Sequence, residues 1–346
     1  MVEVLSSRNM LLWITEGPNP VIRERFSDHV MDSAINYIDS LSVERKYSAL
    51  RLLTDSGAYT AARKNIVLNP YKVLEIQRLL KSDICIPLDY PFMPGMTIKE
   101  VQERWKLTIE NTRLWVEALN KSIEVMPIVH AIGRHNLFET VEILSNIAGN
   151  SEYMAIGTVT FSVDNLKGYL GDRQLSVGFI NALLESLKVI KREYGYKVHV
   201  AGFGSSPLTL HLAIYLGIDS TDSSGFRRRA AYGKILLPGK GERYVGRGDA
   251  RFGVAKFTPQ DQRLLEKCNC PVCRSDPSLL WKSWRARAIH NEWVLKRSWQ
   301  EGLQMAREDF EKYERYLDTM FENSSLRYIW KYIKIKHRYG DLLELL

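Results

Sequence analysis

Short apolar stretches recur along the chain, and each one ends in a small or acidic residue. Several have the length and the unbroken apolar character of strands that are buried on both faces. They are NMLLWITEG, ALRLLTDSG, DICIPLDYP, VMPIVHAIG, YMAIGTVTF, KVHVAGFGS and LGIDSTDSS. We therefore predict a sheet that is covered on both of its faces.

Helical patterns separate these stretches. Residues 97–122 repeat apolar side chains at three- and four-residue spacing behind Thr97, which is a suitable N-cap. Residues 176–195 repeat the pattern and stop at Gly195. Strands that alternate with helices form a parallel sheet, and roughly seven or eight such units favour a (β/α)8 barrel. No G-x-G-x-x-G motif follows the first strand, which weakens the alternative of an open dinucleotide-binding sheet.

The pattern changes near residue 226. Two short β-prone runs surround a Gly-Lys-Gly turn, which predicts a hairpin. Residues 291–324 then have the spacing of one or two long amphipathic helices. We expect residues 1–260 to form the barrel, with its active site at the strand ends. Residues 261–346 should form a metal-binding and helical subdomain packed on it.

Composition narrows the class of protein. The 346 residues are 45% hydrophobic and 25% charged, which is ordinary for a globular chain. We find no stretch of eighteen apolar residues and no secretory leader, so we expect a cytoplasmic protein without a membrane span. The net charge of +8 suits a polyanionic partner such as nucleic acid, although many basic proteins bind none.

Three of the four cysteines lie in one C-x-C-x2-C motif: Cys268, Cys270 and Cys273. In a reducing cytoplasm such a cluster indicates a metal site and not a disulfide framework. Zinc in structural sites prefers a closed tetrahedron of thiolate and imidazole ligands. His290 is the expected fourth ligand, contributed by a following helix, and His337 is the alternative. Four protein ligands leave no position for a reacting water, so the zinc should be structural.

The cysteine motif, followed by a His-Asn pair and preceded by a barrel pattern, resembles the tRNA-guanine transglycosylase superfamily. LTDSGAY resembles the family's strand-end T-D-S-G-G-[FY] motif, and GIDSTDSSG stands in the place of its G-[VI]-D-x-[FM]-D nucleophile motif. HVAGFGSSPLTLHLAIYLGID resembles the segment that leads to the nucleophile. These motifs occur in the family's order and cover about residues 50–300.

The resemblance implies an enzyme that exchanges guanine in a nucleic acid for a 7-deazaguanine by double displacement, as retaining glycosidases do. Asp222 resembles the nucleophile and Asp55 the acid–base carboxylate. Asp89 aligns with the residue that binds the amidine edge of the base. Gly157 falls where backbone groups meet the base. Taken alone, Asp55 and Asp89 are also suited to turns or caps, and Asp219 is the alternative nucleophile.

Several positions depart from the family pattern. Tyr59, by contrast, keeps the aromatic residue that is usual in the family and is the expected stacking partner of the purine. His130 replaces a glutamine, and an imidazole cannot present the paired donor and acceptor of an amide. We therefore expect altered base recognition, or a purely structural His130. Arg227, Arg228 and Arg229 replace a Pro-Thr-Arg type stretch that helps to read tRNA, and they are suited to phosphates or to a solvated surface.

These departures favour the DNA-modifying branch, which inserts 7-cyano-7-deazaguanine (preQ0) into DNA, over the same exchange on tRNA in the queuosine or archaeosine pathway. We expect no cofactor besides zinc. The partners should be DNA more than tRNA, the free base, and either a second copy of the chain or a helper protein. The alternatives are a nucleic-acid-binding subunit without activity and an unrelated barrel hydrolase.

Overall fold

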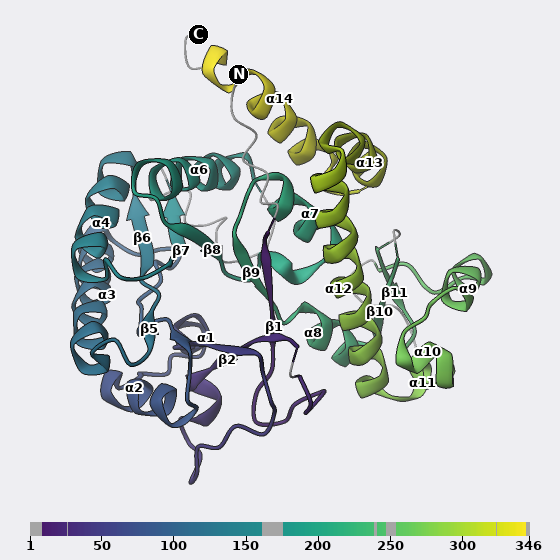
Figure 1. The fold of residues 1–346 in the computed structure, drawn as a ribbon, viewed down its shortest axis with the longest axis horizontal. Coiled ribbons are helices and arrows are strands. Elements are labelled where there is room, and N and C mark those ends of the chain that lie inside the picture. Colours follow the sequence, from purple (N-terminus) through teal and green to yellow (C-terminus); the bar gives the residue numbers. More distant parts are fainter. Residues whose placement is uncertain are drawn as a thin grey trace.

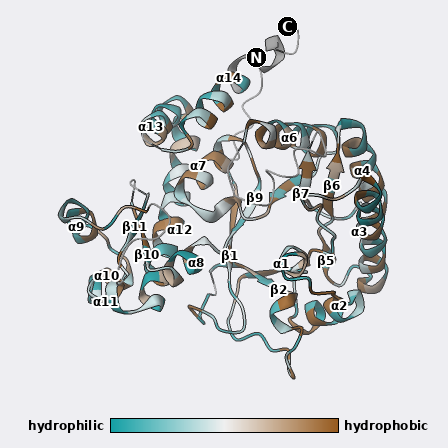
Figure 2. Cartoon of the chain, turned by 180° about the vertical axis from the view of Figure 1, so that it is seen from behind, coloured by the Kyte–Doolittle hydropathy of each residue, from teal (hydrophilic) through white to brown (hydrophobic). Residues whose placement is uncertain are grey.

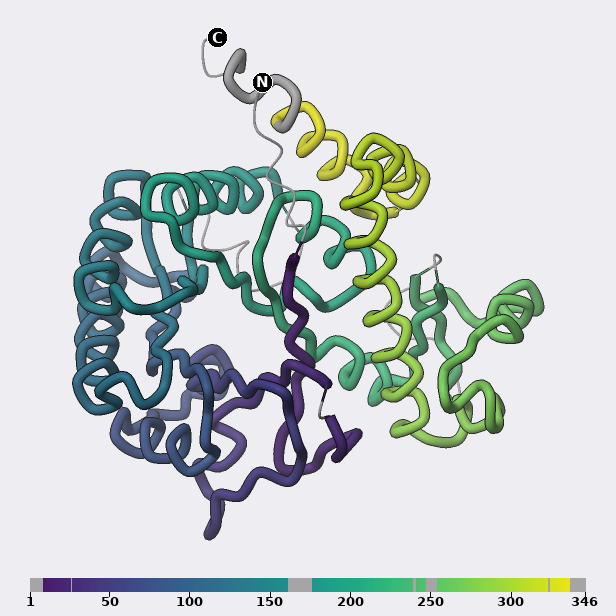
Figure 3. Tube along the Cα trace, in the orientation of Figure 1, coloured from purple at the N-terminus to yellow at the C-terminus, as the bar shows by residue number. Residues whose placement is uncertain are grey.

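A computed structural model describes residues 9–25, 27–160, 176–238, 241–246, 254–322 and 324–343. Its centre is a ring of parallel strands surrounded by helices (Figure 1). The strands of the ring are β1 (Leu11–Thr15), β2 (His29–Ser33), β3 (Arg51–Asp55), β4 (Ile84–Cys85), β5 (Glu124–Val125), β6 (Ile128–Ile132), β7 (Tyr153–Thr160), β8 (Lys197–Val200) and β9 (Ser220–Ser223). Figure 3 shows the chain running around the ring from purple to green before it leaves.

The ring closes as a (β/α)8 barrel. Hydrogen bonding orders its strands β5-β4-β3-β2-β1-β9-β8-β7-β6. β5 and β6 are two parts of one strand, interrupted at Pro127, which has no N–H to donate. The Met126 N–H donates to the Cys85 carbonyl at 2.9 Å, and the Ala155 N–H donates to the Pro127 carbonyl at 2.8 Å. Counted in this way, eight parallel strands surround the centre, which confirms the predicted fold class.

One strand of the ring, β2, was not among the predicted strands. Its sequence is HVMDS, and the buried side chain of Asp32 interrupts its apolar pattern. Asp32 accepts hydrogen bonds from the hydroxyls of Tyr37 at 2.8 Å and Tyr47 at 2.7 Å. A buried strand with such a polar residue cannot be recognised from its apolar positions, because the partners of that residue come from later segments of the chain.

The helices cover the outside of the ring, and in Figure 2 they carry both hydrophilic and hydrophobic colour. Thr97 caps α3, as expected, and forms a capping box with Glu100. The helices around the barrel are α1 (Ala58–Lys64), α2 (Pro70–Leu79), α3 (Ile98–Leu119), α4 (Arg134–Ile147), α6 (Val177–Leu187), α7 (Pro207–Tyr215) and α8 (Gly225–Ala231). Short helical turns occupy Ala34–Tyr37, Lys188–Glu193 and Phe203–Ser205.

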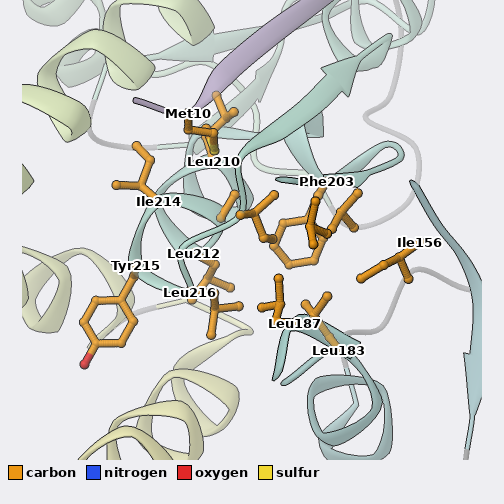
Figure 4. Packing of buried hydrophobic residues seen from close by; sticks show 14 of the residues in the cluster. Met10, Ile156, Leu183, Leu187, Phe203, Leu210, Leu212, Ile214, Tyr215 and Leu216 are labelled. Carbon is orange, nitrogen blue, oxygen red and sulfur yellow. The ribbon is translucent and has the colours of Figure 1, made fainter. Parts of the chain in front are cut away.

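Two apolar layers hold the barrel. The inner layer fills the ring and consists of Trp13, Met31, Leu53, Ile84, Ile86, Met126, Ile128, Tyr153 and Ala155. The outer layer packs strands against helices, and Figure 4 shows the part of it in which Phe203 and Ile156 face Leu183 and Leu187. Because the ring is filled with side chains, polar residues that point inward gather at its ends.

The remaining elements lie outside the ring. They are β10 (Lys234–Leu237), β11 (Gly241–Tyr244), α9 (Pro259–Glu266), α10 (Pro271–Ser275), α11 (Leu279–Lys282), α12 (Trp284–Glu308), α13 (Phe310–Glu322) and α14 (Arg327–Leu343). β10 and β11 form the predicted antiparallel hairpin, although Gly239 and Lys240 of its turn lie outside the described residues. We call β10, β11, α9, α10 and α11 the lobe. α12 runs between the barrel and the lobe, in contact with α7, α8 and β10 (Figure 1).

Within the described residues, no helix combines the length and the apolar character needed to cross a membrane.

Candidate functional site

Carboxylates gather at the C-terminal end of the barrel strands. Asp55 is the last residue of β3, and Asp222 is the penultimate residue of β9. Asp222 is paired in register with Trp13, which belongs to the inner layer, so the Asp222 side chain also points into the ring. Asp55 is paired in register with Ser33, whose hydroxyl lies 3.5 Å from its Oδ1.

Asp55 has an unusual acidity. Its pKa is raised to about 7, mainly by burial and also by the charges of Asp89 and Asp222, against the lowering effect of hydrogen bonds from Gly57 and Ser33. Electrostatic coupling to both carboxylates means that the three groups share one end of the barrel. A carboxyl group with this pKa is present in both its protonated and its ionised form near pH 7.

Gly57 shapes the turn that carries Asp55. Its φ is +83°, and a Cβ atom at this position would lie 2.4 Å from Cγ2 of Ile35. The Gly57 N–H donates to Oδ1 of Asp55. The glycine of the LTDSGAY motif is therefore a structural requirement for holding the carboxylate.

Asp222 and Asp219 occupy different environments. The Asp222 side chain is 9% exposed, and its Oδ1 accepts the Gly202 N–H at 2.5 Å. Asp219 precedes β9 at the opposite end of the strand, where it binds Lys191 Nζ at 2.8 Å and the Val198 N–H at 2.8 Å. The geometry favours Asp222 as the residue available for chemistry and gives Asp219 a structural role.

His130 is bound to Asp89, so its imidazole does not offer a free hydrogen-bonding edge to a base. Its Nδ1 accepts the Thr158 N–H at 2.8 Å, so a neutral ring carries its proton on Nε2. Nε2 then donates to Oδ2 of Asp89 at 2.9 Å, while the Ser56 hydroxyl donates to Oδ1 at 3.0 Å. Asp89 is thus held from both sides, and His130 positions it.

Gly157 lies against the same imidazole. A Cβ atom at Gly157 would come within 2.3 Å of Cε1 of His130, so no side chain fits while the ring is there. Tyr59 lies in the first turn of α1, is 40% exposed, and has the Arg63 guanidinium 5.9 Å from its ring centroid. The role of each toward a base stays a prediction.

The three arginines of α8 differ from one another. Arg227 forms an ion pair with the buried Glu16 at 2.6 Å, and Arg229 forms one with Glu242 at 2.8 Å. Arg228 is exposed. Arg227 and Arg229 therefore have ion-pair partners within the chain, and the role of the three arginines toward phosphates stays a prediction.

The cysteine motif and His290 form one cluster. The ligand atoms of Cys268, Cys270, Cys273 and His290 all lie within 4.8 Å of one another and could hold a metal ion. The Nδ1 of His290 is 3.7, 3.4 and 3.5 Å from the three sulfur atoms in chain order. His290 belongs to α12, as expected, so the cluster joins that helix to the turn before α10.

Residues around the cluster fix its histidine. Nε2 of His290 donates to the Leu236 carbonyl at 2.8 Å, which leaves Nδ1 as the ligand atom. The buried Asn291 accepts the Leu236 N–H at 2.7 Å and donates to the Lys234 carbonyl at 3.0 Å. The His-Asn pair therefore binds β10 to α12.

Sequence patterns did not single out the residues that support the carboxylates. Ser56 and Gly202 lie in turns directly after β3 and β8, where a small residue after a strand is the only signal. His199 lies inside β8 with its Nε2 at 3.8 Å from Oδ1 of Asp222. A histidine within the apolar run KVHV is the signal that points to it.

Comparison with known proteins identifies similar sequences. Residues 29–301 match the profile of the queuine tRNA-ribosyltransferase family. The chain is 28% identical to a tRNA-guanine(15) transglycosylase of Aeropyrum pernix over 269 residues, covering 74% of this chain and 46% of the relative. For relatives of the same name, the identity is 27% over 267 residues in Pyrococcus abyssi and 26% over 312 residues in Archaeoglobus fulgidus.

These matches cover 70% and 85% of this chain, and 38% and 56% of the two relatives. The chain thus spans about half or less of the length of the curated relatives that it matches.

Proposed function

Because this chain belongs to the queuine tRNA-ribosyltransferase family, we propose that it exchanges a guanine in a nucleic acid for a free 7-deazaguanine base. The observation that carries this proposal is the placement of Asp55 and Asp222 at the C-terminal ends of their strands, with Asp89 bound to Ser56 beside Asp55 and with the charges of Asp89 and Asp222 raising the pKa of Asp55. A nucleophile, an acid–base group and a base-binding carboxylate within one site are what double displacement at a sugar requires.

In the first displacement, a carboxylate oxygen of Asp222 attacks C1′ of the target nucleotide, which has left its stack. The C1′–N9 bond breaks and its electron pair leaves with guanine. Protonated Asp55 supplies a proton to the departing purine, so guanine leaves as the neutral base. The products are a sugar ester of Asp222 and an ionised Asp55.

In the second displacement, Asp55 takes the N9 proton of the incoming base, and N9 attacks C1′. The ester bond to Asp222 breaks, and the carboxylate is restored with its charge. Asp55 ends protonated, ready for the next cycle. Asp89, held by His130 and Ser56, accepts hydrogen bonds from the amidine N–H groups that guanine and its 7-deaza analogues share.

We propose tRNA as the nucleic acid. The names of the relatives support it, since each is described as acting on tRNA. The expected preference for DNA depended in part on the arginines of α8. Arg227 and Arg229 are paired with Glu16 and Glu242, so they give that preference little support. DNA, the expected substrate, becomes the alternative, while the 7-cyano form of the base and a second copy or helper as partner stay predictions.

We propose that the cluster holds a structural zinc ion. Zinc–sulfur bonds of about 2.3 Å and zinc–nitrogen bonds of about 2.0–2.1 Å at tetrahedral angles imply sulfur–nitrogen separations of about 3.6 Å. The distances of 3.4–3.7 Å around Nδ1 of His290 agree with this geometry. Four ligands close the site, so zinc would brace the lobe without taking part in exchange.

We further propose a cytoplasmic location, where the free cysteines would stay reduced.

Radiolabelled guanine separates the substrates in one experiment. The chain is incubated with labelled guanine and with either total tRNA or genomic DNA of matched guanine content. We expect label in tRNA, and none after Asp222→Asn. Asp219→Asn is the matched control, because that carboxylate lies at the other end of β9 and pairs with Lys191.

Label in DNA alone would overturn the choice of tRNA while keeping the chemistry. Absence of label in both pools, with a properly folded and metal-loaded chain, would contradict the proposed exchange.

A further inference from the structure

A buried imidazole beside Asp222 has no role in the exchange described above. His199 lies on β8, which pairs with β9, and its side chain is fully buried. Its Nε2 is 3.8 Å from Oδ1 of Asp222. Within the described part of the chain, this Nε2 belongs to a small group of buried polar side-chain atoms without a hydrogen-bond partner. The ring therefore faces the proposed nucleophile with one nitrogen uncommitted.

The other nitrogen determines where the proton lies. Nδ1 of His199 is 2.9 Å from the hydroxyl oxygen of Ser220. Burial lowers the pKa of His199 to about 4, so the ring is neutral at neutral pH and carries a single N–H. A lone pair on Nε2 would repel the carboxylate of Asp222, which favours the tautomer with the proton on Nε2. Ser220 then donates to Nδ1, and Nε2 directs its N–H toward Asp222.

We propose that His199 is a positioning residue that, with the Gly202 N–H, holds Oδ1 of Asp222 and stabilises its charge when the carboxylate leaves C1′. This inference rests on the proposed function. The separation exceeds the roughly 2.9 Å of a hydrogen bond, but such contacts commonly tighten when substrate binds.

The charge of Asp222 differs between the steps. The ionised carboxylate is present before the first displacement, is absent in the sugar ester, and returns as the ester bond breaks and N9 bonds to C1′. A donor at Oδ1 stabilises the ionised forms relative to the ester. Its removal should therefore slow the second displacement more than the first and increase the fraction of chain held as ester.

Two substitutions at one position test this. His199→Leu removes the donor at similar volume, and His199→Gln retains an amide N–H near the position of Nε2. Single-turnover rates of guanine release and of base incorporation into tRNA are measured separately. For His199→Leu we expect base incorporation to slow about tenfold relative to guanine release, with more ester trapped on a denaturing gel. His199→Gln should recover most of the lost rate.

His211→Leu is the matched control. His211 is also a buried histidine whose pKa burial lowers to about 4, but it lies on α7 and contacts Tyr313 at 2.9 Å and Ser298 at 3.0 Å. This control should lose stability and keep the ratio of the two rates. If His199→Leu does not fold, Ser220→Ala serves instead, because it removes the hydroxyl that fixes the tautomer.

An unchanged ratio in His199→Leu, or in Ser220→Ala where that replaces it, would overturn the inference. A wild-type chain that exchanges guanine would at the same time uphold the proposed function. A wild-type chain that forms no ester and exchanges no base would contradict the proposed function itself, so the two failures are distinguishable.

Discussion

At the scale of single residues, the carboxyl of Asp55 connects folding to chemistry. Its pKa of about 7 in the folded chain exceeds the value of about 3.9 of an unfolded chain. A pKa raised by folding means that the folded chain binds the proton more tightly. The group therefore contributes stability at low pH, and this contribution is lost as pH rises from about 4 to about 7.

Substitution of Asp55 should reveal the stability that the wild-type chain loses as pH rises. Asp55→Asn removes the titration, so we expect the variant to gain stability over the wild type as pH rises from 5 to 8, by about 1–3 kcal/mol. Thermal melts of both chains at the two pH values measure it. Asp219→Asn is the control, because its carboxylate is paired with Lys191. A stability difference that does not change with pH would contradict the assigned pKa.

The same pKa predicts opposite pH dependence for the two displacements. Guanine release needs protonated Asp55, so its single-turnover rate should fall about tenfold per pH unit above pH 7. Base incorporation needs the ionised form and should fall at lower pH, with a midpoint below 7, because the ester removes the Asp222 charge that helps to raise the pKa of Asp55. Rapid-quench measurements of guanine release and of base incorporation, made on tRNA bound to the chain, test this. Parallel pH profiles for the two steps would contradict it.

The contact between Gly157 and His130 allows a test without substrate. Gly157→Ala places a Cβ atom against the imidazole, and we expect a loss of stability of about 1–3 kcal/mol. In a His130→Ala background the clash is removed, so the same substitution should cost less than about 1 kcal/mol. Denaturant unfolding of the four chains measures the coupling, and equal costs in both backgrounds would contradict the packing.

At the scale of elements, the apolar runs predicted most of the barrel. The strands around Leu12, Leu53, Val129 and Val200 have mainly apolar sequences, because both of their faces are covered. β2 could not be found in this way, since its Asp32 is satisfied by tyrosines that folding brings to it. Apolar patterns depend only on neighbouring residues in the sequence. The burial of a polar residue depends on hydrogen-bond partners that folding brings to it from other segments.

The site could be predicted only in part for the same reason. The strand-end position of Asp55 is visible in the sequence, but its pKa depends on the charges of Asp222 on β9 and of Asp89 in the segment after β4. The pairing of Arg227 with Glu16 joins residues far apart in the chain and could not be inferred from the arginine run. The partners of His130 likewise come from other segments, Thr158 from β7 and Asp89 from the segment after β4.

Asn291 forms the contact between secondary-structure elements that a substitution can test most directly. It binds backbone groups of β10 and α8 while it lies on α12. Asn291→Leu leaves a buried N–H and two carbonyls without their partner, so we expect a loss of about 2–4 kcal/mol in the free energy of unfolding. Hydrogen exchange should increase first at Leu236. Protection of Leu236 at the wild-type level would contradict this role.

At the scale of the whole molecule, the lobe is joined to the barrel through α12. The apolar cluster of the lobe includes Ile235, Leu237 and Val245 of the hairpin region together with the three cysteines. We therefore propose that the lobe begins with β10, before the expected boundary at residue 261. Metal binding at the lobe should then stabilise contacts that reach the barrel.

Removal of the metal tests this connection. Cys270→Ser should lower bound zinc below one equivalent per chain and lower the melting temperature by several degrees, because structural metal binding contributes to folding. Cys85→Ser is the matched control, since Cys85 is buried in the barrel and away from the cluster. Zinc content by mass spectrometry and thermal melts measure both. One equivalent of zinc in Cys270→Ser would contradict the site.

The central claim is that Asp222 bonds to the sugar of the target nucleotide. The most direct measurement is mass spectrometry of peptides from chain denatured during turnover with tRNA and a 7-deazaguanine base. We predict an adduct of the sugar phosphate without its base on the peptide that contains Asp222, present in Asp219→Asn and absent in Asp222→Asn. An adduct on another residue, or exchange that proceeds at the wild-type rate in Asp222→Asn, would contradict the account.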